Sequence, residues 1–310
     1  DEDKIISKGA LGAGSCVNVG LNTGGIEFKD PSKTRDNNKA NFDTRLYKLG
    51  YAKPEKNTYQ PKQKFLFNYT DEAVNKILIP MIKEGKEPIG SMGDTARPAI
   101  LSSEVRSFFD YFYQNFAQVT NPPLDYLREK MVTELSVYLG PRPNIFAKKE
   151  LIPPPIALEL PGPVLSLGQL EHITKHGNKD ESDSGIKSET IDIIFSRQYG
   201  IVDFNSQLNN ISKKVLELVK NGTSIIILSD RNADFENLPI PVLIILRHVV
   251  IELDKAGVRL KVSIVIDSGQ IFTTHHMAAT IGFGASAVCP YLALNFARYE
   301  NLGTLNEVSP

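Results

Sequence analysis

The sequence predicts an α/β protein in which helices cover both faces of a largely parallel β-sheet. First, short apolar runs alternate with amphipathic helical patterns through the carboxyl-terminal half. Second, these runs are apolar along their whole length, as in 224–228 and 261–266, which is typical of strands buried on both faces of a parallel sheet. Third, the chain has 310 residues and is 41% hydrophobic, so it can bury a sizeable core, with about two domains expected.

A short β segment is expected at the amino terminus, followed by a polar linker. Apolar residues alternate over 17–21, and the residues 22–25 predict a tight turn into a second strand at 26–28. Residues 29–64 are rich in Lys and Asn and contain three prolines, so they can bury little apolar surface. We interpret them as a linker or insertion with one short helix near 42–49.

A helical part is expected next along the chain. Thr70 precedes two acidic residues, which is the pattern of a helix N-cap, and Gly85 is expected to end this first helix. Pro80 is expected to kink the helix or to end it earlier. A second helix over about 103–116 carries large apolar side chains at three- and four-residue spacing, and a third over about 124–139 repeats the pattern.

Strands and helices then alternate toward the carboxyl terminus. Strands are predicted at 191–195, 224–228, 261–266 and 287–288, and helices at 208–218, 240–255 and 273–281. Residues 176–189, which come before these elements, are polar and almost without large apolar side chains. This composition predicts a mobile surface insertion.

Composition and charge exclude several classes of protein. The 35 basic and 36 acidic side chains give a net charge of −1, which supplies no excess of positive charge for binding nucleic acid. The longest apolar stretch, 239–253, is interrupted by Arg247 and His248 and is shorter than the roughly 20 residues that span a bilayer. The two cysteines, Cys16 and Cys289, suit a reducing compartment. We therefore expect an intracellular protein without nucleic-acid or membrane partners.

Polar residues follow two predicted strands at the edge where parallel α/β sheets bind ligands. Asp230 and Arg231 come directly after the strand at 224–228, and Asp267 follows the strand at 261–266. Two interpretations stay open for them. They form either a ligand or partner site, or an Asp–Arg pair that holds the loop and the start of the next helix.

The adjacent histidines His275 and His276 are expected to act in capping, in hydrogen bonding or in a contact between domains. Neighbouring side chains on a helix point about 100° apart, and Ala279 and Thr280 stand where a second metal ligand would be needed. Cys289 has no basic neighbour in the sequence to lower its pKa, so a buried structural thiol is expected. No catalytic residue and no metal site are predicted.

Two loops beside predicted helices combine small polar side chains with backbone that can be exposed. The first contains Ser91, Gly93 and Asp94, and the second contains Thr120 and Asn121. Their composition alone fits simple connections and functional loops equally well.

At these loops the sequence resembles a known family. The runs Gly90–Ser102 and Asp110–Asp125, the latter containing Phe-Ala-Gln-Val-Thr-Asn-Pro-Pro, resemble the central domain of glutamate synthase. Matching runs at 222–231 and 282–285 follow in the same order. Residues 7–14 resemble the last segment of the glutamine amidotransferase domain that precedes the central domain. The end of an amidotransferase domain, a polar linker and a central domain are therefore expected at 1–28, 29–64 and 65–310.

The resemblance implies a connecting domain with Rossmann-like topology that performs no catalysis by itself. In this family a glutaminase domain releases ammonia, which crosses an internal tunnel to an FMN barrel and there combines with 2-oxoglutarate and reducing equivalents to give glutamate. FMN and an iron–sulfur cluster are implied for other domains, so no cofactor is expected in this chain, and the isolated chain is expected to be inactive. The implied partners are the glutamine amidotransferase and FMN-binding domains of the same polypeptide, in the cytoplasm or in an organelle such as a plastid.

The resemblance also makes certain residues candidates for contacts between domains or for the surroundings of the tunnel. They are Ser91, Gly93, Asp94, Thr120, Asn121, Asp230, Arg231, His275 and His276. Ammonia stays unprotonated only where few charges are exposed, and the small neutral groups in the two loops suit such a passage. The sequence departs from the usual family pattern at Asn68, where Gly is usual, at Asp267, where Glu is usual, and after Asp94, where a second acidic residue is missing.

An alternative stays open in which the chain is an independently acting α/β domain or enzyme that binds a small molecule. In that case Asp230, Arg231, Asp267 and His275 would surround a ligand in a closed pocket at the carboxyl edge of the sheet. A connecting domain instead places these side chains in structural hydrogen bonds or at surfaces between domains.

Overall fold

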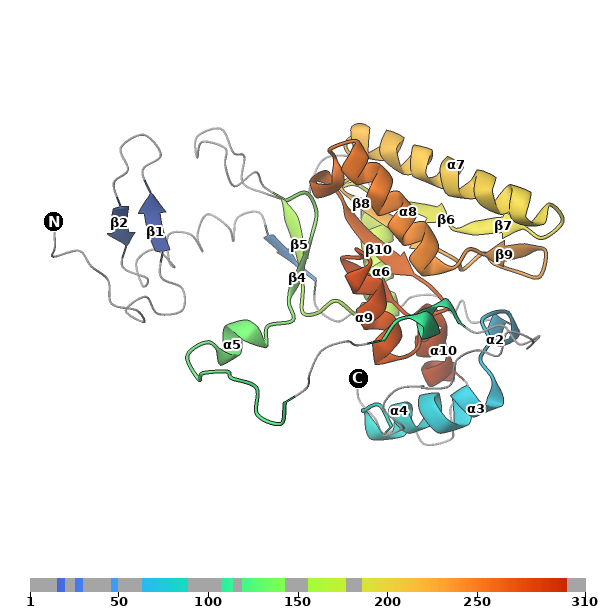
Figure 1. The fold of residues 1–310 in the computed structure, drawn as a ribbon, viewed down its shortest axis with the longest axis horizontal. Coiled ribbons are helices and arrows are strands. Elements are labelled where there is room, and N and C mark those ends of the chain that lie inside the picture. The colour runs from blue at the N-terminus through green and yellow to red at the C-terminus, as the bar shows by residue number, and fades with distance from the viewer. Residues whose placement is uncertain are drawn as a thin grey trace.

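A parallel sheet forms the centre of the molecule. The computed structural model describes residues 16–19, 26–29, 46–49, 63–88, 107–113, 119–142, 156–176 and 186–299 (Figure 1). Within them, the largest sheet has four parallel strands in the order β11-β10-β8-β6. The strands are β6 (Ser188–Asp192), β8 (Ile225–Ser229), β10 (Ser263–Asp267) and β11 (Ala287–Cys289). The predicted α/β class is confirmed.

Helices cover both faces of this sheet. Successive strands are joined by α7 (Gly200–Lys220), α8 (Val242–Lys255) and α9 (Thr274–Gly282), which pack on one face. The other face is covered by α6 (Leu167–His176), which precedes the first strand, and by α10 (Tyr291–Tyr299), which follows the last. The strands are therefore shielded from water on both sides, which is why their sequences are apolar throughout.

The alternation of side chains along each strand divides the core into two parts. Ile226 and Leu228 of β8 lie in the cluster that includes α7 and α8, whereas Ile225 and Ile227 lie in the cluster that includes α6 and α10. The same division holds in β10, because successive strand residues point to opposite faces. Consequently, the face of the sheet toward which each residue of β8 or β10 points is set by its position in the strand.

Most predicted elements of the carboxyl-terminal half agree with the structure, but the first strand does not. The strand expected at 191–195 is divided between β6, which ends at Asp192, and β7 (Ile194–Ser196), which pairs with β9 (Asn237–Pro239) in a separate ribbon. Ser188 and Glu189 belong to β6 and not to a surface insertion. The centre of the expected insertion, 177–185, lies outside the described residues.

A second, smaller sheet corrects two predictions. It has the order β3-β5-β4 and is formed by β3 (Leu46–Lys48), β5 (Ala157–Leu160) and β4 (Val137–Leu139). The short helix expected near 42–49 is therefore wrong at β3, which pairs in parallel with β5. β5 lies more than a hundred residues after β3 in the sequence, so a local sequence pattern cannot predict this pairing.

The helix expected over 124–139 is also wrong. Only α5 (Glu129–Val132) is helical, and the chain then enters β4, which pairs antiparallel with β5. Leu139 is fully buried there, whereas the other apolar residues of the expected helix face are exposed. We call residues 119–136, which include α5 and end before β4, the arm. A helical pattern without a core beside it does not form a stable helix of that length.

The aromatic run after Ser107 forms a single turn in place of the predicted helix. A 3₁₀ turn spans Phe108–Tyr111, and Phe112 is extended. Phe109 is buried, whereas Tyr111 and Tyr113 are exposed. The aromatic residues are therefore divided between core and surface, although the helix expected to carry them is not present at 108–113.

The first predicted helix is confirmed from Asp71 to Glu84. The Thr70 hydroxyl accepts a hydrogen bond of 3.1 Å from the Ala73 N–H, and Gly85 ends the helix with a φ of 63°. Pro80 does not end it. A π-helical turn over 74–78 precedes the proline. Proline has no backbone N–H to donate, and a π-helical turn is one way in which a helix accommodates the missing hydrogen bond.

The departure at Asn68 has a clear structural reason. The helix α2 (Gln63–Leu66) ends with Asn68 at a φ of 57°, and the Tyr69 N–H donates to the Lys64 carbonyl over 3.0 Å. This is a Schellman ending, which favours glycine at the left-handed position. Asparagine adopts this left-handed conformation more readily than most residues with a side chain, so Asn68 can serve where glycine is usual.

The two strands expected at the amino terminus pair in antiparallel orientation, as β1 (Cys16–Val19) and β2 (Ile26–Lys29). The turn expected at 22–25 lies outside the described residues. Within the ranges given above, no helix has both the length and the apolar character that crossing a membrane requires.

Candidate functional site

The carboxyl ends of β8 and β10 bring the predicted polar residues together. Asp267 is paired with Ser229 in the register of the two strands, and Asp230 and Arg231 follow directly. Asp230 is fully buried and Asp267 is nearly so. The expectation that these residues meet at the edge of the sheet is therefore correct.

Asp267 holds Arg231 in a two-pronged ion pair. The Arg231 Nε lies 2.6 Å from Asp267 Oδ2, and Nη2 lies 3.0 Å from Oδ1. The Ser229 hydroxyl donates to the same Oδ2 over 2.8 Å. Burial acts to lower the pKa of Arg231, but the charge and hydrogen bonds of Asp267 outweigh it and hold that pKa above its usual value. Arg231 therefore stays charged, and it neutralises the buried carboxylate.

The aromatic ring of Tyr291 covers the guanidinium group. The Arg231 Cζ lies 4.4 Å from the centre of this ring, within the range of a cation–π contact. The Arg231 carbonyl accepts a hydrogen bond of 2.9 Å from the Gln63 amide. Arg231 thus connects the edge of the sheet to α10 and to α2, which are distant in the sequence.

Asp230 organises a different loop. Its carboxylate accepts hydrogen bonds from the Ser268 hydroxyl at 2.5 Å, the Gly269 N–H at 2.9 Å and the Gln270 amide at 3.1 Å. Gln270 in turn accepts a hydrogen bond of 3.1 Å from the Val242 N–H. This N–H lies in the first turn of α8 and has no partner within the helix. Asp230 therefore fixes the loop after β10 against the start of α8.

Burial raises the pKa of Asp230 to about 6, and the nearby Asp267 carboxylate adds to the increase. The hydrogen bonds from Ser268, Gly269 and Gln270 act in the opposite direction, because they favour the ionised form. A carboxylate with this pKa is a candidate for proton transfer when a reactant can reach it. Here the side chain has no exposed surface and its oxygens are already bonded to three donors.

A close contact explains the glycine in this loop. A side chain at Gly269 would place its Cβ 2.8 Å from the ring of Phe67, which is too short for any contact of this kind. Phe67 lies just after α2, so its ring packs directly against the backbone of the loop at Gly269.

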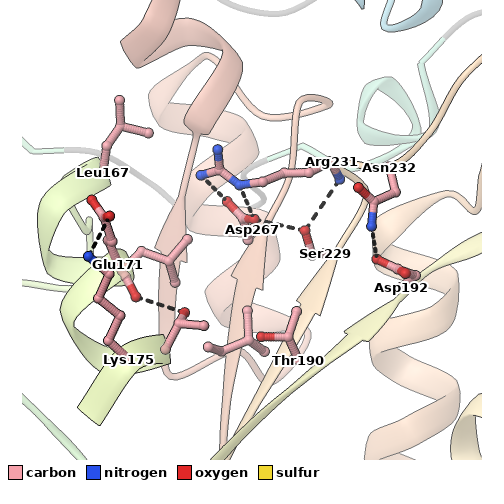
Figure 2. A pocket seen from close by; sticks show the side chains of 12 residues that line it. Leu167, Glu171, Lys175, Thr190, Asp192, Ser229, Arg231, Asn232 and Asp267 are labelled. Atoms are coloured by element: carbon pink, nitrogen blue, oxygen red, sulfur yellow. Dashed lines mark hydrogen bonds and ion pairs between the residues drawn. The ribbon is translucent and has the colours of Figure 1, made fainter. Parts of the chain in front are cut away.

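A cavity of about 340 Å³ lies beside the ion pair. It is bounded by α6 on one side and by the ends of β6, β8 and β10 on the other, as Figure 2 shows. Its lining comprises Leu167, Leu170, Glu171, Thr174, Lys175, Thr190, Asp192, Ile227, Ser229, Arg231, Asn232 and Asp267. Arg231 and Asp267 reach it, but Asp230 and His275 are not part of the lining. The four residues of the alternative interpretation therefore do not share this pocket.

His275 and His276 lie at the start of α9, among aromatic residues. The His276 ring stacks on Phe109 with 4.4 Å between ring centres, and the His275 Nε2 lies 3.1 Å from the Phe109 carbonyl. Burial lowers the pKa of His276 to about 4, and His275 adds to this decrease. His276 is therefore neutral at pH 7, and together the histidines hold the turn at 108–111 against α9.

The other candidates lie elsewhere. Thr120 and Asn121 are exposed at the beginning of the arm, and Ser91, Gly93 and Asp94 lie outside the described residues. Burial raises the pKa of the Cys289 thiol well above its usual value, so the thiol is protonated at neutral pH. Among the side chains that the structure describes, no group of three or more His, Cys, Asp or Glu residues could hold a metal ion.

Sequence reasoning missed part of the cluster. Tyr291 lies two residues after the end of the buried strand β11, so the rule that placed Asp230 at the edge of the sheet could also have found it. Gln63 and Gln270 carry no such signal. Their roles depend on α2 and α8 being folded against the sheet.

The family model and the curated relatives point to one family. Residues 62–308 match the glutamate synthase central domain. The chain is 36% identical to the chloroplastic ferredoxin-dependent glutamate synthase of Spinacia oleracea over 317 residues, covering 97% of this chain and 19% of that protein. It is 34% identical to the NADPH glutamate synthase large chain of Bacillus subtilis over 308 residues, with the same two coverages.

A third relative, the NADH glutamate synthase of Schizosaccharomyces pombe, is 36% identical over 233 residues, which cover 75% of this chain and 11% of that protein. A solved structure of flavocytochrome b2 with sulfite bound overlaps 43% of this chain and 29% of that chain, with a TM-score of 0.26 at 16% identity, which is too low to equate the two folds. The chain thus spans about a fifth of the length of the first two relatives. The match over most of its length shows that the chain belongs to the glutamate synthase central-domain family.

Proposed function

We propose that the chain is the connecting body of a glutamate synthase, placed between a glutaminase domain and an FMN barrel and contributing to the surroundings of the ammonia tunnel. In this role it performs no bond-making itself. The FMN and the iron–sulfur cluster of the complete enzyme would be bound by other domains. The family match and the large share of the relatives that lies outside this chain support the proposal.

The main structural support is the way the polar cluster at the edge of the sheet is used. Asp267 bonds to Arg231 and Ser229, and Asp230 bonds to the loop after β10. These are hydrogen bonds that hold helices and loops in place, as expected of a rigid spacer. A body of this kind keeps two distant active centres at a constant separation.

The passage of ammonia suggests a role for the beginning of the arm. Thr120 and Asn121 are neutral, exposed and small, and they lie in the run that most resembles the family. A wall of hydroxyl, amide and carbonyl groups lets ammonia pass without protonating it, whereas exposed acidic groups would convert it to ammonium. We therefore propose these two residues, with Ser91 and Gly93, as part of the tunnel surroundings.

A bulky substitution at Thr120 in the complete enzyme tests this proposal. The variant Thr120→Trp should lower the amount of 2-oxoglutarate converted per glutamine hydrolysed by roughly twofold or more, because ammonia released by the glutaminase escapes to solvent. The matched control is Ser206→Trp, which changes an equally small hydroxyl residue on the exposed side of α7. A conversion ratio in the Thr120 variant equal to that of the wild type and of the control contradicts the tunnel role.

The cavity beside Arg231 favours a second candidate function, the binding of a small molecule. Its lining combines apolar side chains, such as Ile227, with neutral polar and charged ones, such as Thr190 and Arg231. This combination is typical of ligand sites at the carboxyl edge of α/β sheets. Calorimetric titration of the chain with 2-oxoglutarate, a nucleotide or a flavin tests it. Saturable binding that is abolished in Thr190→Trp, which fills the cavity, favours this function, whereas no heat of binding from any of them contradicts it.

A further inference from the structure

The arm carries a concentration of exposed apolar side chains that the proposed tunnel residues do not explain. The exposed fraction of the large apolar residues in the arm ranges from 45% for Leu124 to 84% for Tyr126. The set comprises Val119, Leu124, Tyr126, Leu127, Met131, Val132 and Leu135. Single apolar residues on a surface are common, but a succession within one short segment marks a surface that is covered by another structure.

The hydrogen bonds that the structure shows in the arm are local. Among the described residues, the hydrogen bonds of the arm join positions no more than four apart, such as Arg128 to Asp125 at 2.9 Å and Thr133 to Glu129 at 2.7 Å. No residue of the arm belongs to either hydrophobic core cluster as described. Its apolar side chains are therefore available to a partner.

The arm nevertheless leaves from a rigid base. Directly after it, Leu139 is fully buried in β4, and Gly140 exchanges hydrogen bonds of 3.0 and 3.1 Å with the Ser263 hydroxyl of β10. Before it, Phe109 is buried against α9. In Figure 1 the arm, with α5, extends away from the sheet on the side opposite α7. A segment that is anchored at its base and exposes apolar side chains at intervals along its length presents a contact surface.

The smaller sheet indicates which structure covers the arm. The arm continues into β4, and β4 and β3 are the two outer strands on either side of β5. These strands have only three or four residues. Neighbouring strands lie about 4.8 Å apart, and each residue advances about 3.3 Å along a strand. The point where the chain enters β3 therefore lies within about 15 Å of the base of the arm. Whatever precedes β3 in the polypeptide is therefore delivered close to the arm.

We propose that the arm packs its apolar side chains against the folded part of the same polypeptide that precedes β3. The relatives extend far beyond the matched region, so the polypeptide has ample chain to form such a partner. The arm has three acidic and two basic residues, and Asp125 pairs with Arg128 within it. The surface that it meets must therefore be mainly apolar, since there is little net charge for a charged partner to match.

This inference rests on the proposed connecting role, and it assigns one of the two contacts of the connecting body to a specific segment. The test uses the full-length polypeptide with a photoreactive benzoylphenylalanine in place of Tyr126. The matched control carries it in place of Tyr199, which is also exposed and lies at the start of α7. Cross-linked peptides are then identified by mass spectrometry, with mixed isotope labelling to separate links within one polypeptide from links between copies.

The expected result is that the probe at 126 links to peptides preceding residue 46 in the same polypeptide, about tenfold more than the probe at 199. Links to the part that follows residue 310 would overturn this inference but leave the connecting role intact. Links only between two copies, or no links at all, would also overturn it. If neither probe links to any other part of the polypeptide, the proposed connecting role itself is contradicted.

A second measurement separates packing from mere proximity. Combining Leu127→Ser, Met131→Ser and Leu135→Ser with the probe at 126 should reduce the cross-linking yield about tenfold, because these side chains carry the contact. Their exposed positions leave the fold of the chain itself undisturbed. The control combines Glu129→Gln with Lys130→Gln on the same turn and should retain the yield. Equal yields in the two combined variants would overturn the proposed apolar contact.

Discussion

The parallel sheet and the arm contain similar apolar residues but use them in opposite ways. In β8, every residue from Ile225 to Leu228 is almost completely buried between helices. In the arm, Leu127 and Met131 stand at helical spacing but are more than half exposed. An apolar pattern therefore identifies residues that will be buried somewhere, while the location of the burying surface depends on the rest of the structure.

The largest expected difference between the two regions comes from truncating one leucine in each. Leu228→Ala removes a side chain with no exposed surface, so it should lower the free energy of unfolding by about 3 kcal/mol. Leu127→Ala should change it by less than about 0.5 kcal/mol, because the side chain is exposed in the folded chain. Urea unfolding of both variants measures the difference. Similar losses in the two would mean that the arm is part of the core after all.

An ion pair in each region gives the next comparison. Asp267→Asn leaves the partly buried Arg231 without its counter-charge and should lower the free energy of unfolding by roughly 2–3 kcal/mol. Asp125→Asn breaks a pair with Arg128 that is exposed to water, and it should leave the urea midpoint almost unchanged. The same pair of measurements in 1 M salt should leave the first effect largely intact, since buried charges are poorly screened. An Asp267→Asn variant as stable as the wild type would contradict the role of this pair.

The buried carboxylate of Asp230 gives the sheet region a pH dependence of opposite sign to that of the arm, where a hydrogen bond from Arg128 lowers the pKa of Asp125. The pKa of Asp230 is about 6 in the folded chain, against an ordinary value of 3.8, so the folded state binds the proton more tightly than the unfolded state. The resulting stabilisation is complete below about pH 4 and is lost as the pH rises through 6.

Asp230→Asn removes this titration. The free energy of unfolding of the wild type minus that of the variant should therefore be larger at pH 4 than at pH 7, as measured by urea unfolding at both values. A difference that is constant or grows with pH would contradict a raised pKa of Asp230 in the folded chain.

The smallest effect is expected at the turn after α2, where backbone conformation and not packing is changed. Asn68→Ala should lower the free energy of unfolding by about 1 kcal/mol, because alanine is strained at a φ of 57°. Asn68→Gly should be neutral or slightly stabilising, since glycine adopts this conformation freely. Thermal unfolding of the two variants compares them. If alanine and glycine were equivalent, the left-handed conformation would not be what favours asparagine.

The sequence predicted the sheet and its edge well, and it predicted the segments at 46–48 and 108–139 poorly. Strands such as 224–228 and the helix over 240–255 have continuous or strongly periodic apolar patterns, and their placement after one another led directly to Asp230, Arg231 and Asp267. The helix expected over 124–139 had a comparable period, yet most of it is arm or strand. Periodicity decides the conformation only when a matching surface is present to bury the apolar face.

The identities of the residues were sufficient to predict which strands are buried, where parallel strands end and which polar groups gather there, because these follow from local patterns and from the common direction of the strands. Folding in three dimensions decided that Asp230 and Asp267 serve separate loops, that Tyr291 covers Arg231, and that residues 137–139 become a strand beside β5. Those outcomes depend on which segments, tens to hundreds of residues apart, come into contact, and a local pattern carries no information about a distant partner.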